Sequence, residues 1–186
     1  NTLKFEITQI PFHYRGCESI SVERIIIQNI EFYKIPTVIY KCIKVTHLQF
    51  DHVPIRNISS WICRLINLKT LILNYNQLTL FPIEIIGLKS LENLTIINNK
   101  IEYIPDEITE LKMIKSINLS YNLIREIPLS ILNISSIEQP EPKLFSFILK
   151  GNLITDIPIS ICHRFACREK FDLSLNFLED WFKNKQ

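Results

Sequence analysis

Apolar and polar positions follow one template that returns along most of the chain. Its three clearest copies span residues 68–82, 91–105 and 114–128, and each begins 23 residues after the one before. Two further copies, residues 144–158 and 168–178, follow after an insertion. A unit of this length cannot bury its apolar side alone, so successive copies must stack on one another. The pattern therefore predicts a solenoid.

Each copy contains a short alternating segment that predicts one β-strand. In the first copy, Leu71 and Leu73 point to one side of the strand and Ile72 points to the other, because successive side chains of a strand alternate. A proline ends each of the first four copies and cannot lie in a central strand. These prolines are Pro82, Pro105, Pro128 and Pro158. Stacked copies thus give a parallel sheet on one side and a return path on the other.

One asparagine follows each predicted strand, where the backbone must turn with its polar groups half buried. The set is Asn76, Asn99, Asn122, Asn152 and Asn176. A side-chain amide supplies donors and an acceptor, so stacked asparagines can satisfy backbone groups from one turn to the next. We predict a structural role for them, and a cost of about 1 to 3 kcal/mol for Asn99→Ala.

The pattern resembles the leucine-rich repeat family. The family motif, LxxLxLxxNxL, is met at Leu68, Leu71, Leu73, Asn76 and Leu78, and again at the equivalent positions of the next two copies. The apolar-proline step at Phe81-Pro82 is similar to the subgroup of Ras-pathway scaffolds and fungal adenylate cyclase. Over about residues 22 to 180, the resemblance implies an α/β solenoid curved like a horseshoe. Its concave side would carry the parallel β-sheet, and its convex side short helical or extended segments.

Upstream of residue 67, the template is degenerate. Apolar-proline pairs at Ile10-Pro11, Ile35-Pro36 and Val53-Pro54 are unevenly spaced, and Ile30 and Leu48 stand where asparagine is expected. Terminal repeats of such arrays are commonly atypical, because one face has no neighbour.

These features predict a single domain over residues 1–186. An N-terminal cap or partial repeat covers residues 1–21, degenerate repeats follow over 22–66, regular repeats over 67–178, and a C-terminal cap over 179–186. Two insertions are expected to bulge out as loops. The first, residues 57–67, carries Trp61, which we expect against the convex layer. The second is residues 135–143.

Composition narrows the functional classes. The chain of 186 residues is 47% hydrophobic with a net charge of +2, and it lacks a run of Lys and Arg, which argues against nucleic acid as a partner. The longest apolar runs are too short to span a bilayer. Only three glycines occur, and none lies in a phosphate-binding loop. We therefore expect no cofactor and no enzymatic activity.

The five cysteines leave at least one thiol unpaired within a monomer. Cys162 and Cys167 could close a small disulfide loop, and Cys42 could approach Cys63 across neighbouring turns. The alternative is that the cysteines are isolated small core residues. A zinc site or nucleophile built on Cys162, His163 and Cys167 is the enzymatic rival, but adjacent ligands rarely reach one metal and no orienting third group is evident.

Signals for the compartment point in two directions. Four N-x-S/T sequons occur, at Asn57, Asn93, Asn118 and Asn133, and we expect glycosylation at Asn57 and Asn133. A chain beginning at Asn1 fits a mature secreted product or a trimmed one. Abundant isoleucine, asparagine and lysine are typical of an AT-rich genome, such as that of a unicellular parasite. Secretion is the first expectation, and a cytoplasmic scaffold is the alternative, since the dense cysteine caps of extracellular members are missing.

The repeat register also predicts the side chains of the concave face. The candidate contact residues are Lys44, His47, Thr70, Ile72, Asn74, Tyr75, Thr95, Ile97, Asn98, Asn118, Ser120, Tyr121, Ile148 and Lys150. Small polar groups, exposed isoleucines and two tyrosines are the mixture found at protein interfaces. A noncatalytic module that binds a protein or peptide is the first functional hypothesis. An intracellular adaptor for a signalling GTPase or phosphatase is the second. If Asn93 or Asn118 carried a glycan, it would obstruct this face.

Overall fold

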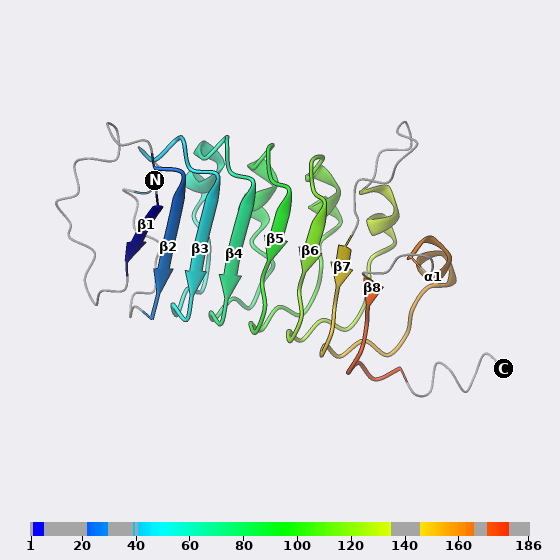
Figure 1. Cartoon of the computed structure of the whole chain (residues 1–186). Helices are drawn as coiled ribbons and strands as arrows, with labels where there is room; N and C mark the ends of the chain where they lie inside the picture. The colour runs from blue at the N-terminus through cyan, green and yellow to red at the C-terminus, as the bar shows by residue number, and fades with distance from the viewer. Residues whose placement is uncertain are drawn as a thin grey trace.

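The computed structural model describes residues 2–5, 22–29, 39, 41–134, 146–165 and 171–178. Within these residues, eight strands form one parallel sheet in which spatial order follows chain order (Figure 1). The strands are β1 (Thr2–Phe5), β2 (Arg24–Gln28), β3 (His47–Asp51), β4 (Thr70–Asn74), β5 (Asn93–Thr95), β6 (Ser116–Asn118), β7 (Ser146–Ile148) and β8 (Phe171–Asp172). The predicted solenoid and its parallel sheet are confirmed.

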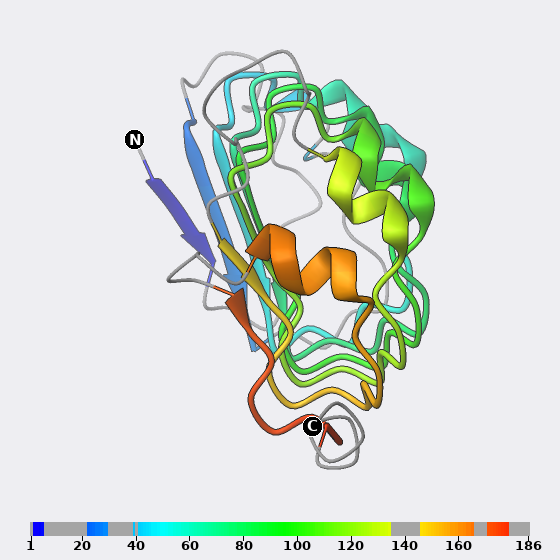
Figure 2. The same ribbon diagram turned by 90° about the vertical axis from the view of Figure 1, so that its right-hand side faces the viewer.

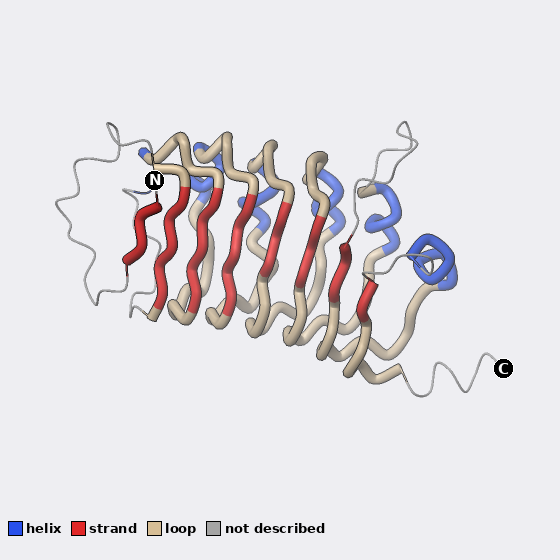
Figure 3. The backbone as a smooth tube through the Cα atoms, in the orientation of Figure 1, coloured by secondary structure: helices blue, strands red, loops and turns tan. Residues whose placement is uncertain are grey.

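The return paths form a second layer opposite the sheet (Figures 2 and 3). It consists of the 3-10 helices η2 (Ser60–Arg64), η3 (Ile83–Gly87), η4 (Asp106–Glu110) and η5 (Leu129–Asn133), followed by the α-helix α1 (Ile159–Phe165). Pro82, Pro105 and Pro128 immediately precede η3, η4 and η5, with φ of −73°, −74° and −67°. Because proline fixes φ near this value, it prepares the backbone for a tight helical turn.

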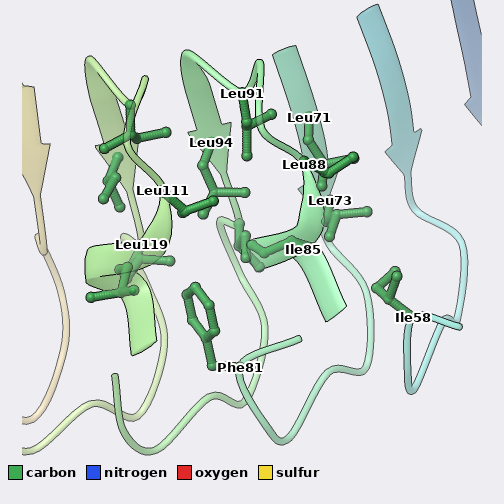
Figure 4. Close-up of a cluster of buried hydrophobic side chains, with 14 of the residues drawn as sticks. Ile58, Leu71, Leu73, Phe81, Ile85, Leu88, Leu91, Leu94, Leu111 and Leu119 are labelled. Carbon is green, nitrogen blue, oxygen red and sulfur yellow. The ribbon is translucent and has the colours of Figure 1, made fainter. Parts of the chain in front are cut away.

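The core lies between the two layers. Each regular strand buries alternate side chains, such as Leu71 and Leu73 on β4, and each return helix adds one buried isoleucine, such as Ile85 on η3 (Figure 4). The side chains between them on β4, including Ile72, are half-buried on the other face of the sheet, as the alternation predicts. Neighbouring turns thus share one continuous apolar core, which explains why the units stack.

The repeat length of the regular copies also holds in the degenerate region. Arg24 pairs with His47, and His47 pairs with Thr70, so β2, β3 and β4 follow one another at this same interval. Likewise, η2 begins at Ser60 and η3 at Ile83, again one repeat length apart. The predicted insertion at residues 57–67 is therefore wrong, because this segment is an ordinary return path. Trp61, on η2, is partly buried and packs against the core.

The Val53-Pro54 pair resembles the apolar-proline step but does not occupy its repeat position. Buried Ile58 occupies that repeat position, one repeat length before Phe81. The asparagine position of this turn is accordingly Val53, whereas Leu48 pairs with Leu71 and lies in the core. Val53 is itself fully buried, so an apolar side chain replaces the amide without opening the core.

The asparagines form a ladder of side-chain hydrogen bonds along the solenoid. The Asn99 Nδ2 atom donates to the carbonyl of Leu73 at 2.8 Å, and its Oδ1 atom accepts from the N–H of Leu78 at 3.1 Å. Asn122 bonds in the same way to Ile96 and Ile101, at 2.7 and 3.2 Å. Each amide therefore joins its own turn to the preceding one. Asn152 and Asn176 continue the ladder.

Several predictions concern residues outside the described part of the chain. These are the second insertion at 135–143, the tail at 179–186, Cys17, Cys167, and the pairs Ile10-Pro11 and Ile35-Pro36. The boundaries of the predicted caps and repeat groups stay predictions. No helix within the described residues is long and apolar enough to cross a membrane.

Candidate functional site

The face of the sheet that is turned away from the core, here called the open face, carries side chains in parallel rows. Paired residues of neighbouring strands define each row. The first row is Arg24, His47, Thr70, Asn93, Ser116 and Ser146. The second is Ile26, Gln49, Ile72, Thr95, Asn118, Ile148 and Asp172. The middle of both rows is uncharged.

The register corrects the predicted face at β3. Lys44 lies before the start of this strand and does not belong to either row, whereas His47 begins the strand. Gln49 and Asp51 occupy the positions of Ile72 and Asn74 on β4. Sequence reasoning missed both residues because the frame was shifted there. Counting back one repeat length from β4 would have found them.

A further row follows the strands at their carboxyl ends. Its members all have positive φ and are Asn29, His52, Tyr75, Asn98, Tyr121, Gly151 and Leu175. We call this set the edge row. The left-handed conformation turns the backbone away from the sheet at each of these residues. Hydrogen bonds to the next turn still form: the His52 N–H donates to the Asn74 carbonyl, and the Tyr75 N–H donates to the Ile97 carbonyl. Only glycine adopts this conformation without a steric cost, so the tyrosines are held there by the surrounding fold.

Tyr75 is exposed at one part of the edge row, where it stacks on His52. The ring centroids are 4.2 Å apart and the planes differ by 10°. The His52 Nδ1 atom in turn lies 3.2 Å from the Asp51 Oδ1 atom. One side of the Tyr75 ring is therefore supported by the preceding turn, while 49% of the residue's surface remains accessible.

Tyr121 is held differently, against the following turn. A Cβ atom placed on Gly151 would lie 2.6 Å from Tyr121 Cδ1 and 2.8 Å from Cε1. The ring therefore occupies the space that a side chain at residue 151 would take. Tyr121 is nevertheless 42% exposed. Asn98, on the turn between the two tyrosines, is half-buried, and its side-chain amide makes no hydrogen bond to other described residues.

Several polar side chains of the open face are engaged within the protein. The Asn118 Oδ1 atom accepts from the Ser120 N–H at 3.0 Å and from its hydroxyl at 2.6 Å. Asn74 Oδ1 accepts from the Ile97 N–H at 3.0 Å. Ser120, predicted as a contact residue, is buried, which corrects that expectation. The other predicted contact residues lie at half-buried or exposed positions of the described chain.

Charged side chains lie toward both ends of the open face, with Arg24 on β2 and Asp51 on β3 at one end and Asp172 on β8 at the other. Burial and the nearby Arg24 guanidinium lower the pKa of His47 from 6.5, although a hydrogen bond with Gln49 acts in the opposite direction. His47 is therefore neutral near pH 7. Three charged residues, Lys69, Glu92 and Lys115, immediately precede β4, β5 and β6. The Lys115 ammonium bonds to Glu92 Oε2 at 2.7 Å and lowers the pKa of that carboxyl, and the Lys69 ammonium lies 3.6 Å from Oε1.

The cysteines and sequons add no chemical centre in the described chain. The Cys63 thiol donates to the Glu84 carbonyl at 3.1 Å, so it is not bonded to Cys42. Cys162 forms no disulfide with another described cysteine, and its pairing with Cys167, which lies outside the described residues, stays a prediction. No cluster of three His, Cys, Asp or Glu side chains fit for a metal occurs among the described residues.

The sequon asparagines are all within the described chain, at two kinds of position. Asn57 and Asn133 are exposed outside the sheet, and glycosylation at both stays a prediction. Asn93 and Asn118 are half-buried on the open face. A glycan on either of these two would stand on the open face.

Residues 66–124 match the sequence model of the family described as leucine rich repeat. Several solved structures are similar to the chain, and three of them are described below. An LRR protein of Leptospira interrogans has 24% identity and a TM-score of 0.73, over 83% of this chain and 38% of that one. Internalin C2 of Listeria monocytogenes has 22% identity and a TM-score of 0.62, over 84% of this chain and 60% of that one. The chain thus has the leucine-rich repeat fold.

The third is the LRR ectodomain of the plant membrane receptor kinase GASSHO1/SCHENGEN3 from Arabidopsis thaliana, in complex with CASPARIAN STRIP INTEGRITY FACTOR 2. It has 23% identity and a TM-score of 0.59, over 83% of this chain and 21% of that one. The present chain therefore spans less than two thirds of the length of each of these structures. No curated protein sequence matches it.

Proposed function

We propose that this chain is a noncatalytic recognition module that binds a protein or peptide through its open face and edge row. The leucine-rich repeat fold supports this proposal, because stacked repeats present one long surface to a macromolecule. The solved receptor ectodomain, in complex with CASPARIAN STRIP INTEGRITY FACTOR 2, is a precedent for binding by a protein of this fold.

The observation that carries the proposal is the pair of exposed tyrosines, Tyr75 and Tyr121, beside a neutral polar sheet. Tyrosine supplies large contact area with few rotatable bonds, and aromatic residues are enriched among the side chains that dominate binding energy. Both rings are supported by neighbouring turns, so little further ordering is required on binding. An uncharged centre also lowers the cost of removing water.

Secretion is the context that we propose first, with exposed Asn57 and Asn133 as glycan acceptors. The free thiols of Cys63 and Cys162 favour the second candidate, an adaptor in a reducing compartment. Mass spectrometry of the native protein under nonreducing conditions separates the two. Glycan mass on either asparagine supports secretion, whereas unmodified asparagines with five free thiols support the adaptor.

The binding role is tested by the double variant Tyr75→Ala/Tyr121→Ala. Crosslinking and affinity capture from the native source should recover a partner with the unchanged chain and at least ten-fold less with the variant. Tyr103→Ala is the matched control, because Tyr103 is 47% exposed but lies outside the open face and edge row. Thermal unfolding should stay within about 3 °C of the unchanged chain for both variants. Equal capture by both variants would refute the proposed binding surface.

A further inference from the structure

Positive charge gathers on one edge of the solenoid, where the return paths lead into the strands at the top of Figure 1. We call the six residues before each of β3, β4, β5 and β6 the entry turns, which are residues 41–46, 64–69, 87–92 and 110–115. The described segment 41–134 carries ten basic and eight acidic side chains. Seven of the basic but only two of the acidic side chains lie in the entry turns. With histidine neutral, this edge carries +5 and the rest of the segment −3.

Stacking creates this cluster of charge, which the linear sequence does not show as a run of Lys and Arg. Equivalent residues of neighbouring turns lie about 4.8 Å apart in space, although a full repeat separates them along the chain. Hydrogen bonds fix the entry turns to one another. The Asn67 side-chain amide donates to the Ile43 carbonyl at 2.9 Å, and the Ser90 hydroxyl donates to the Ile66 carbonyl at 2.6 Å.

The two acidic side chains of the entry turns are engaged within the edge. Glu92 lies between the ammonium groups of Lys69 and Lys115, at 3.6 and 2.7 Å, so that one carboxylate faces two cations. Glu110 lies 3.7 Å from Lys112. The edge therefore keeps an excess of positive charge after its own ion pairs have formed.

Exposed aliphatic side chains stand among these lysines. Ile43 is 57% exposed, Ile66 63% and Met113 44%. Ile43 and Ile66 occupy one repeat position on neighbouring turns, and Lys89 and Lys112 occupy the same position on the next two. Surfaces that lie in the interface of a bilayer combine these two features, because aliphatic groups enter the boundary between headgroups and acyl chains while cations meet anionic lipid.

We propose that the entry turns dock the chain, edge-on, onto a membrane surface that contains anionic phospholipid. The contact is peripheral. Ile43, Ile66 and Met113 enter the headgroup region, and the lysines around them lie against the lipid phosphates and carboxylates. The edge row lies at the opposite ends of the strands, so the open face and the edge row stay accessible from the solvent (Figure 1). This inference goes beyond the function proposed above and does not depend on it.

Other polyanions fit this edge less well. The entry turns contain no aromatic residue, whereas proteins that hold single-stranded nucleic acid stack its bases on aromatic rings. Six of the seven basic residues are lysines, whose ammonium is a point charge, whereas directed recognition of a phosphate or carboxylate favours the planar fork of arginine. An acidic polymer also offers no apolar phase for the exposed isoleucines, and a bilayer does.

Co-sedimentation with vesicles tests the proposal on the unchanged chain. Vesicles of phosphatidylcholine with about one third phosphatidylserine are compared with pure phosphatidylcholine at an ionic strength of about 0.15 M. Polyglutamate and oligo-dT serve as soluble polyanions. We expect the vesicles that contain phosphatidylserine to bind at least ten-fold more tightly than each of the other three probes, and the binding to weaken as salt is raised.

Charge reversal assigns the binding to the entry turns. Lys44 and Lys89 form no ion pair with described residues, and the Lys89 ammonium makes an exposed bond to the Ile86 carbonyl at 3.3 Å. Each basic group at an anionic bilayer strengthens binding by about five-fold, so Lys44→Glu/Lys89→Glu should weaken it by at least twenty-fold. Lys100→Glu/Arg125→Glu makes the same change of net charge at exposed residues beyond the other ends of β5 and β6, and should stay within about three-fold.

A second pair of variants separates lipid from other polyanions. Ile43→Ser/Ile66→Ser keeps every charge and should weaken vesicle binding by at least about five-fold, with binding to polyglutamate unchanged. Leu80→Ser/Leu129→Ser is the matched control, because both leucines are 59% exposed and lie outside the entry turns. Its vesicle binding should stay within about two-fold. Urea unfolding of each variant shows that the fold is retained.

Three results would overturn the inference. They are equal binding to both kinds of vesicle, equal losses for the two charge-reversed variants, and vesicle binding that is unchanged in Ile43→Ser/Ile66→Ser or matched by a soluble polyanion. The proposed function is tested separately. Tyr75→Ala/Tyr121→Ala should bind vesicles as the unchanged chain does, and Lys44→Glu/Lys89→Glu should still capture the partner, so either proposal can fail without the other.

Discussion

Replacing Asn99 should destabilise the protein more than replacing Asn76, although both occupy the same repeat position and both are buried. The two amides differ in what they satisfy. Asn99 donates to Leu73 and Ile97 and accepts from the Leu78 N–H. Asn76 donates to Phe50 and Asn74 at 3.1 and 2.8 Å, but its Oδ1 atom has no hydrogen-bond partner among the described residues.

The difference originates one turn upstream. The N–H that would reach Asn76 Oδ1 belongs to Ile55, and it bonds instead to the carbonyl of Val53 at 2.6 Å. Pro54 stands between these two residues and shapes that local turn. Asn76 thus carries an unsatisfied buried acceptor, whereas Asn99 does not.

The magnitudes follow from the groups that each alanine leaves unpaired. Asn99→Ala leaves the buried Leu78 N–H without its acceptor and removes a bond to the Leu73 carbonyl, which should cost about 2 to 3 kcal/mol. Asn76→Ala loses the bond to Phe50 but also removes the unsatisfied oxygen, so its cost should be about 1 kcal/mol. The expected difference is about 1 to 2 kcal/mol.

Urea unfolding followed by circular dichroism measures both values in one background. The midpoint should fall for each variant, and further for Asn99→Ala, while the slope of the transition stays unchanged. Equal losses for the two variants would show that the Oδ1 bond to the preceding turn contributes nothing. A larger loss for Asn76→Ala would refute the reasoning from unsatisfied groups.

Three further predictions test the edge row and the charged groups. Gly151→Ala should cost about 1 to 2 kcal/mol in thermal unfolding, because φ is +67° at this residue and the added Cβ would displace the Tyr121 ring. Unchanged stability would contradict the packing of Tyr121 against Gly151. The pKa of His47 is lowered in the folded chain, so the unfolded chain binds more protons and stability should fall as the pH drops below about 6.5. The dependence of stability on pH in this range should be weaker in His47→Gln. An identical pH dependence in that variant would exclude His47 as its cause. The pKa of Glu92 is lowered in the folded chain, so this carboxylate contributes stability above pH 4.5, which is lost as the pH falls through the folded pKa. Glu92→Gln should therefore lose less than about 1 kcal/mol of stability at pH 7 and none at pH 2. A larger loss at pH 2 than at pH 7 would refute this pH dependence.

Much of the fold could be predicted because the same pattern of buried and exposed positions recurs in each repeat. Alternation placed Leu71 and Leu73 in the core and Ile72 on the other face, and stacking placed the strands in parallel. The asparagines could be assigned since a strand end needs donors and an acceptor at one position. Where Val53 takes that position, the signal disappears, and the nearby Val53-Pro54 pair points to the wrong frame.

The candidate site was less predictable because it depends on contacts between turns. Tyr75 and Tyr121 were identified, but nothing in their spacing shows that one rests on His52 and the other on Gly151. Each of those neighbours lies a full repeat or more away in the sequence. The positive φ shared by the whole edge row is likewise invisible in a row that mixes asparagine, histidine, tyrosine, glycine and leucine.

For the binding proposed above, the distribution of hydrogen bonds favours a larger contribution from the edge row than from the strands. Asn74 and Asn118 already accept bonds from the backbone within the sheet, and the Ser120 hydroxyl is used by Asn118. A partner that bonds to these atoms must share or break an existing bond, so the net gain is small. Tyr75 and Tyr121 offer exposed apolar area instead, at positions that the fold already holds, and a ligand gains most by covering that area.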